Sequence, residues 1–222
     1  LFDANTDFLK RYAYQIKEAL KSHTHFGING GLTFEQEHEI LDRPEFQLTP
    51  LLKMLHGKVV RQLGSSGGGN HFVEFGEMEL FAGNVLNLPE GKYTALLSHS
   101  GSRGMGAAVA KHYSNIARET CRLPREAQHF AWLNLDTEVG QEYWVSMNLA
   151  GDFAKANHER IHINLSKALG LKVMANVNNH HNFAWREEIT PGKYAIVHRK
   201  GATPAGKGVP GVIPGRMAAA GY

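Results

Sequence analysis

The amino-acid sequence predicts an α+β fold, with mixed sheets and surrounding helices, on three observations. Apolar residues that recur every four positions indicate helices, and apolar runs that border glycine-rich loops indicate strands. The helices and strands do not alternate in a regular strand–helix–strand rhythm, which argues against a doubly wound parallel sheet. The chain has 222 residues, of which 42% are hydrophobic and 20% charged, and this suits one substantial globular domain. We therefore interpret residues 1–222 as a single domain.

The N-terminal quarter is predicted to be mainly helical. A four-residue apolar spacing predicts a helix over residues 7–21. Its apolar positions are Phe8, Tyr12, Ile16 and Leu20. Residues 22–34 contain HTHFGINGG, which predicts a loop, and a second helix is expected from Thr49 to about His56.

The rest of the chain mixes strands, helices and glycine-rich loops. GSSGGGN precedes a strand-like HFVEF, and YTALLSHS predicts another strand. Helices are predicted over residues 105–120 and 138–169. LKVMANVNNHHNFAW suggests a strand and a loop, KYAIVHRKG suggests a strand, and GATPAGKGVPGVIPGRM suggests a long loop.

Composition sets broad limits on function. The formal charge of +3 permits a nucleic-acid partner without arguing for one. The single cysteine, Cys121, cannot form an intrachain disulfide, which indicates a reducing compartment, and we expect a cytoplasmic protein. No run of 18 apolar residues and no signal peptide occur, so no membrane association is expected.

The glycine-rich loop GSSGGGN is the first candidate for chemistry. Glycine lets backbone N–H groups approach a phosphate closely, although the P-loop's Lys-Ser/Thr pair is missing. Asn70, His71 and Glu74 follow, and they offer an amide, a metal ligand and a carboxylate. In a straight strand His71 faces away from the other two, so a shared site requires a bulge or a His71 that precedes strand pairing. A structural loop with an ordinary histidine is the alternative.

Three further segments add candidates. SHSGSRGMG places His99 at a strand end and Arg103 before a helix, where an anion site or a plain N-cap fits. NVNNHHNFAW holds two adjacent histidines that point in opposite directions if the segment is extended. Arg199 and Lys200, at another strand end, fit phosphate contacts or a basic surface turn. Three histidines at strand ends suit a transition metal.

One further histidine pair is interpreted as having no functional role. His158 and His162 lie four residues apart on a predicted helix and could together hold a metal. We interpret them instead as part of a solvated helix face.

Taken together and in this order, four segments resemble the RtcB family of RNA ligases. They are GGGNHFVE, HSGSRGMG, HHNFAW, and RKGATPA with VIPGRM. Each is weak alone, whereas the series over residues 55–222 is specific; residues 1–54 match less distinctively.

The resemblance implies a set of site residues. Metal ligands for two Mn(II) ions would be His71, His99 and His181, the last chosen over His180 because it directly precedes Asn182. Nucleotide contacts would come from Asn70, His71, Phe72, Val73, Glu74, His181, Asn182, Pro214, Gly215, Arg216, Met217 and Gly221. RNA or phosphate contacts would come from Arg103, Arg199 and Lys200.

The resemblance also implies a reaction. Such ligases use GTP and Mn(II) to join an RNA 3′-phosphate or 2′,3′-cyclic phosphate to a 5′-hydroxyl, in tRNA splicing or RNA repair. A histidine attacks the GTP α-phosphate, the guanylate moves to the RNA 3′-phosphate, and the 5′-hydroxyl then attacks this activated end and releases GMP. A cyclic phosphate is first opened by hydrolysis. Two divalent ions can neutralise phosphate charge and align the reacting groups. RNA ends and GTP are therefore the expected partners of a monomer.

The sequence departs from the family pattern in three ways. The family's guanylylated His segment and its Asp-x-Gly-Cys-Gly-like metal segment do not occur in residues 1–222. Arg216 and Gly221 occupy positions where the family pattern has serine, which suggests a divergent member. We therefore expect a chain that is incomplete at both ends, holds no catalytic nucleophile and cannot ligate alone. End-joining by the 222-residue chain would contradict this expectation.

Two other functions fit the residues. A metal-dependent phosphoesterase could use the same histidines to activate water, and it would need no GTP. A non-catalytic RNA-binding relative would keep the fold with structural histidines, and it should purify without stoichiometric metal.

Overall fold

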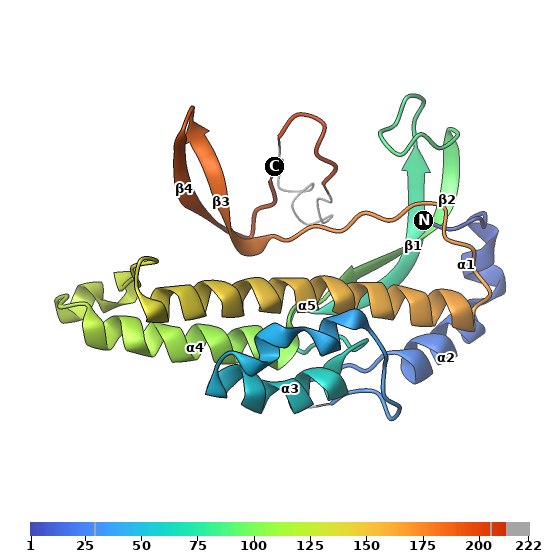
Figure 1. Ribbon diagram of the computed structural model, residues 1–222. Helices are drawn as coiled ribbons and strands as arrows, with labels where there is room; N and C mark the ends of the chain where they lie inside the picture. Colours follow the sequence, from blue (N-terminus) through green and yellow to red (C-terminus); the bar gives the residue numbers. More distant parts are fainter. Residues whose placement is uncertain (29, 205, 212–222) are drawn as a thin grey trace.

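A computed structural model of the protein describes residues 1–28, 30–204 and 206–211. One long helix runs across the molecule (Figure 1). This helix, α5 (Glu138–Ala168), is capped at its N-terminus by Thr137, whose hydroxyl accepts a hydrogen bond from the Gly140 N–H at 3.2 Å. Other helices line one side of α5, and two β-hairpins stand on the opposite side (Figure 1).

The helical side forms the larger core. It contains α3 (Pro50–Gln62), α4 (Arg103–Thr120) and the short 3-10 helices η1 (Glu39–Asp42) and η2 (Pro44–Gln47), with η3 (Arg125–Phe130) after α4. Apolar residues of α3, α4, η1 and η2 form this core together with α5, and the fully buried members include Phe46, Leu52, Met105, Leu149 and Phe153. Burial of this apolar surface is the main stabilising term for the layer.

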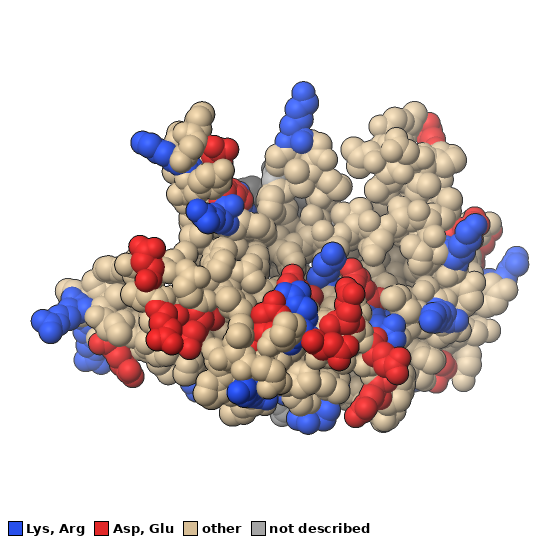
Figure 2. Space-filling model, in the orientation of Figure 1, with Lys and Arg blue, Asp and Glu red and all other residues tan. Residues whose placement is uncertain are grey.

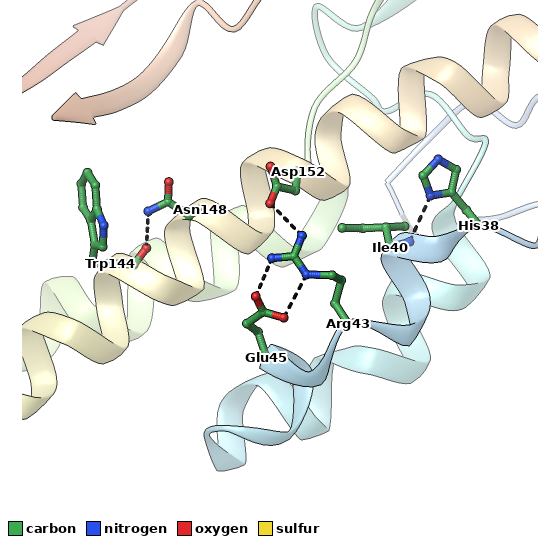
Figure 3. A network of polar contacts seen from close by, with 7 residues as sticks. All are labelled: His38, Ile40, Arg43, Glu45, Trp144, Asn148 and Asp152. Carbon is green, nitrogen blue, oxygen red and sulfur yellow. Dashed lines mark hydrogen bonds and ion pairs between the residues drawn. The ribbon is translucent and has the colours of Figure 1, made fainter. Parts of the chain in front are cut away.

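Arg43 ties the 3-10 helices to α5 (Figure 3). Its Nε donates to Glu45 Oε2 at 2.9 Å, and its Nη1 donates to Asp152 Oδ2 on α5 at 3.3 Å. Hydrogen bonding from the guanidinium lowers the pKa of the Glu45 carboxyl. Nearby, His38 caps η1 by accepting from the Ile40 N–H at 3.1 Å. Because these ion pairs are partly exposed, they mainly fix orientation and add little stability.

The two described sheets are separate antiparallel hairpins. In the first, β1 (Phe72–Leu80) pairs with β2 (Gly91–His99), from Phe72 opposite His99 to Leu80 opposite Gly91. In the second, β3 (Asn182–Thr190) pairs with β4 (Lys193–Lys200), with an irregularity near the turn. The predicted α+β class is confirmed, but these sheets are purely antiparallel instead of mixed, because each is a hairpin of two strands that follow each other in the chain.

The N-terminal segment braces the first hairpin. The predicted helix over residues 7–21 is divided into α1 (Asp7–Arg11) and α2 (Ala13–His23), because Tyr12 leaves the helical conformation. Before α1, the Phe2 N–H donates to Thr94 O and the Thr94 N–H donates to Ala4 O, both at 3.0 Å. The open edge of β2 is thereby covered.

A second, smaller core joins α2, β1 and α5. Its buried members are Ala19, Val73, Ile161 and Leu165. Since α5 contributes to both cores, it carries the first hairpin and the helical layer as one packed unit.

Two predicted elements differ from the structure. The helix expected over residues 49–56 continues to Gln62, and the strand expected after residue 170 is absent from the described chain except for one bridge between Phe2 and Val173. Residues 171–181 run instead as an irregular segment along α5 (Figure 1). None of the described helices is both long and apolar enough to cross a lipid bilayer.

Candidate metal centre and its cavity

Three histidines from separate segments meet beside α5. The His99 ring lies 5.6 Å from the His71 ring and 4.8 Å from the His181 ring, measured between centroids. His71 ends the glycine-rich loop, His99 ends β2, and His181 directly precedes β3. The three predicted ligands are therefore neighbours although they are up to 110 positions apart in the sequence.

The position of His71 settles the geometric question that the sequence raised. Strand pairing begins at Phe72, opposite His99, and the β1–β2 register runs without a bulge. His71 therefore lies in the loop before pairing, where its direction is independent of the strand. Phe72 stacks on the His99 ring with centroids 5.4 Å apart. Asn70 and Glu74 are exposed beside it, while Val73 faces the second core.

The environment of His71 and His99 favours the neutral imidazole, because it lowers the pKa of both rings. Burial is the main cause that lowers the pKa of His71, and the nearby Arg103 charge adds to it. Burial also lowers the pKa of His99, with His181 as the next cause. A neutral imidazole offers a lone pair, which is the form that binds metals.

One nitrogen of His71 is buried without a partner. Its Nδ1 atom makes no hydrogen bond to any described residue. A buried nitrogen of this kind is costly unless something binds it, and a metal ion would do so. The chemistry of the three histidines therefore fits a transition metal, although no three His, Cys, Asp or Glu side chains of the described residues yet converge on one ion position.

Two of these three histidines, His99 and His181, line a large cavity. This cavity of about 810 Å³ is lined by both strands of the first hairpin, by α5, and by residues 173, 175–179, 201–203 and 210–211. His99, His158, His162 and His181 line it. Its volume suits a nucleotide-sized ligand. A smaller hollow of about 190 Å³ lies near Arg43 and Trp144 and has no histidine, so we place the site in the larger cavity.

The assignment of His158 and His162 to a solvated helix face was wrong. His158 Nε2 lies 2.6 Å from Ser100 O and 3.2 Å from Ser100 N, so the ring bonds to the Ser100 backbone. His162 Nε2 lies 2.9 Å from the Ser98 hydroxyl. Both rings face β2 and the cavity, and their four-residue spacing, noted in the sequence, was the signal for a shared role.

We expect His162 to make folding sensitive to acid. Burial is the main cause that lowers its pKa from 6.5 to about 4. Between these values the unfolded chain binds the proton and the folded chain does not, so stability should fall as pH drops through this window. The full loss is on the order of 3 kcal/mol.

Urea unfolding at several pH values tests this expectation. His162→Gln cannot be protonated, so its stability should depend less on pH than that of the parent between pH 6.5 and about 4. Parallel pH profiles for the two proteins would contradict the assignment.

The two predicted basic arginines are engaged within the protein. Arg103 adopts a positive φ of 54°, and its guanidinium donates to Gly27 O at 2.6 Å and to Ser65 Oγ at 3.0 Å. Arg199 forms a bidentate pair with Glu187 and lies over the Trp185 ring. Their RNA or phosphate contacts stay predictions.

The remaining predicted contacts fall into two groups. Asn182 begins β3 and pairs with Lys200, and both are exposed at the base of the second hairpin near His181. The other predicted nucleotide contacts lie outside the described residues; they are Pro214, Gly215, Arg216, Met217 and Gly221. On the face drawn in Figure 2, acidic and basic side chains are interspersed, and no large basic patch is visible.

Comparison with known proteins adds an independent finding. A family model described as tRNA-splicing ligase RtcB matches residues 5–222. A tRNA-splicing ligase RtcB of Thermococcus kodakarensis is 33% identical over 193 residues, covering 72% of this chain and 40% of the relative. The RNA-splicing ligase RtcB of Escherichia coli K12 is 29% identical over 181 residues, covering 75% of this chain and 41% of the relative.

A third relative aligns with almost the whole chain. The tRNA-splicing ligase RtcB of Nanoarchaeum equitans is 28% identical over 251 residues, covering 96% of this chain and 52% of the relative. The chain thus spans about half, or less, of the length of the relatives it matches.

Proposed function

Because this chain belongs to the RtcB family, we propose that it carries part of the metal site of an RNA ligase. The protein would join an RNA 3′-phosphate or 2′,3′-cyclic phosphate end to a 5′-hydroxyl end, using GTP and Mn(II) through a histidine–guanylate intermediate. Family membership supports RNA end-joining as the reaction class.

The observation that carries the proposal is the meeting of three histidines, two of which line a large cavity. His71, His99 and His181 come from three segments, and His71 keeps a buried nitrogen without a described partner. Their imidazoles would hold Mn(II), which when bound would neutralise phosphate charge. A structural cluster would be expected to hydrogen-bond such a nitrogen internally, so the buried Nδ1 without a described partner favours a ligand.

The surrounding groups suit a nucleotide and RNA ends. The cavity is large enough for a guanine nucleotide, and the glycine-rich loop borders His71. Asn70, Glu74 and Asn182 are exposed polar groups close to the histidines, and we propose that they contact the nucleotide. Lys200, exposed opposite Asn182, would contact the RNA phosphate.

GTP dependence separates ligation from hydrolysis. We expect RNA with 3′-phosphate and 5′-hydroxyl ends to be joined only when both GTP and Mn(II) are present, with the full-length protein as catalyst. Gel analysis of end-labelled RNA would measure this, with ATP in place of GTP as control. Release of phosphate from the 3′ end without GTP would instead identify a metal-dependent phosphoesterase.

A further inference from the structure

Asn157 on α5 is fully buried and bonds to two loops at once. Its Oδ1 accepts from the Gly64 and Ser65 N–H groups at 2.8 and 3.1 Å. Its Nδ2 donates to Ser65 O at 2.9 Å, to Ser100 Oγ at 3.2 Å and to Gly101 O at 3.3 Å. The side-chain amide of Asn157 thus acts both as donor and as acceptor, and its partners lie in two separate loops.

These are the two loops that lead to the metal-site histidines. Gly64 and Ser65 begin the glycine-rich loop that ends at His71, whereas Ser100 and Gly101 follow His99 directly. The Ser100 hydroxyl also donates to Ser65 O at 3.3 Å, which closes the contact between the loops.

The place of Asn157 in the helix is unusual. Every fourth residue of the buried stripe of α5 is apolar except this one, and the stripe reads Leu149, Phe153, Asn157, Ile161 and Leu165. All five side chains are at most 1% exposed. An apolar residue would fill the same space without the cost of burying an amide, so the polar group has to be explained by what it binds.

We propose that Asn157 is a positioning residue that sets the separation of His71 and His99 and thereby the affinity of the site for a divalent metal. The inference rests on the proposed metal site. His158, the next residue, supports the same arrangement because its Nε2 bonds to the Ser100 backbone, 2.6 Å from Ser100 O and 3.2 Å from Ser100 N. Two consecutive residues of one rigid helix therefore hold the segment that carries His99.

Substitution of Asn157 by leucine tests the proposal. Leucine has similar size and matches its neighbours in the stripe, but it cannot hold the loops. Mn(II) affinity, measured by electron paramagnetic resonance, should weaken by about 10- to 100-fold, the range typical of residues that orient metal ligands. The visible absorption of bound Co(II) should also change, since it reports the ligand geometry.

Asn164 offers a matched control on the same helix. Its Nδ2 donates to Gln36 Oε1 at 2.9 Å, and among the described residues it bonds to neither loop. Asn164→Leu also removes one amide, so it should lower stability while Mn(II) affinity and the Co(II) spectrum stay as in the parent.

A second variant covers the case in which Asn157→Leu does not fold. Ser100→Ala removes only the hydroxyl that bridges Asn157 and Ser65, and it should weaken Mn(II) binding several-fold. Amide hydrogen exchange of Gly64 and Ser65 can be measured without any metal. Both amides should exchange faster in Asn157→Leu, because their N–H groups lose the acceptor Asn157 Oδ1. If the parent binds no Mn(II), the proposed function fails. The positioning role is wrong if the parent binds Mn(II) and the folded Asn157→Leu variant binds it equally well. If Asn157→Leu does not fold, the same comparison is made with Ser100→Ala.

Discussion

His99→Ala should abolish metal binding. His99 is the central ring of the three, within 5.6 Å of His71 and 4.8 Å of His181. Without it the two outer imidazoles have no common neighbour, so we expect Mn(II) affinity to fall by more than about 100-fold, since even residues that only orient ligands cost 10- to 100-fold. RNA joining by the full-length protein should fall with it. Calorimetry with Mn(II) and a joining assay measure the two effects.

His112→Ala is the matched control for this prediction. His112 is an exposed histidine of α4 that packs on Tyr113 and does not line the cavity. Its loss should leave Mn(II) affinity and joining unchanged. Equal effects of the two substitutions would show that His99 has no special place in the site.

Gly67→Ala should displace His71. A Cβ atom at position 67 would lie 1.7 Å from His71 Nδ1 and 2.8 Å from Arg103 Nη1, distances that no real contact permits. The imidazole must therefore move, and we expect a loss of Mn(II) affinity of about 10- to 100-fold together with about 1–3 kcal/mol of stability. Mn(II) titration and urea unfolding would measure both.

Gly101→Ala is the control, since it adds the same methyl group on the other side of the ring. Its Cβ would lie 3.9 Å from His71 Nε2, an ordinary contact. Mn(II) affinity should therefore stay near that of the parent. If Gly67→Ala also kept the parent's affinity, the placement of His71 against the glycine-rich loop would be incorrect.

Helices and strand positions followed well from local patterns. The four-residue spacing of apolar residues predicted the N-terminal helical region, and the glycine-rich loops predicted where the first hairpin begins. The irregular run of residues 171–181, which bridges to Phe2 and lies along α5, depends on tertiary contacts that no local pattern records.

The sequence predicted the three histidines of the site, but it did not predict the residues that surround and position them. The motifs named His71, His99 and His181, and the structure brings these rings together. The surroundings were missed because burial is a tertiary property: His158 and His162 resemble a solvated pair in sequence, yet both bond to the β2 region. Asn157 could have been found, since it interrupts a regular apolar stripe.

The measurement that tests the central claim most directly is metal-dependent GTP binding by the purified protein. Elemental analysis would give the bound metal, and calorimetry would give GTP binding with and without Mn(II). We predict stoichiometric Mn(II) and GTP binding that requires it. A protein that holds neither metal nor GTP would contradict the claim that these histidines form a ligase metal site.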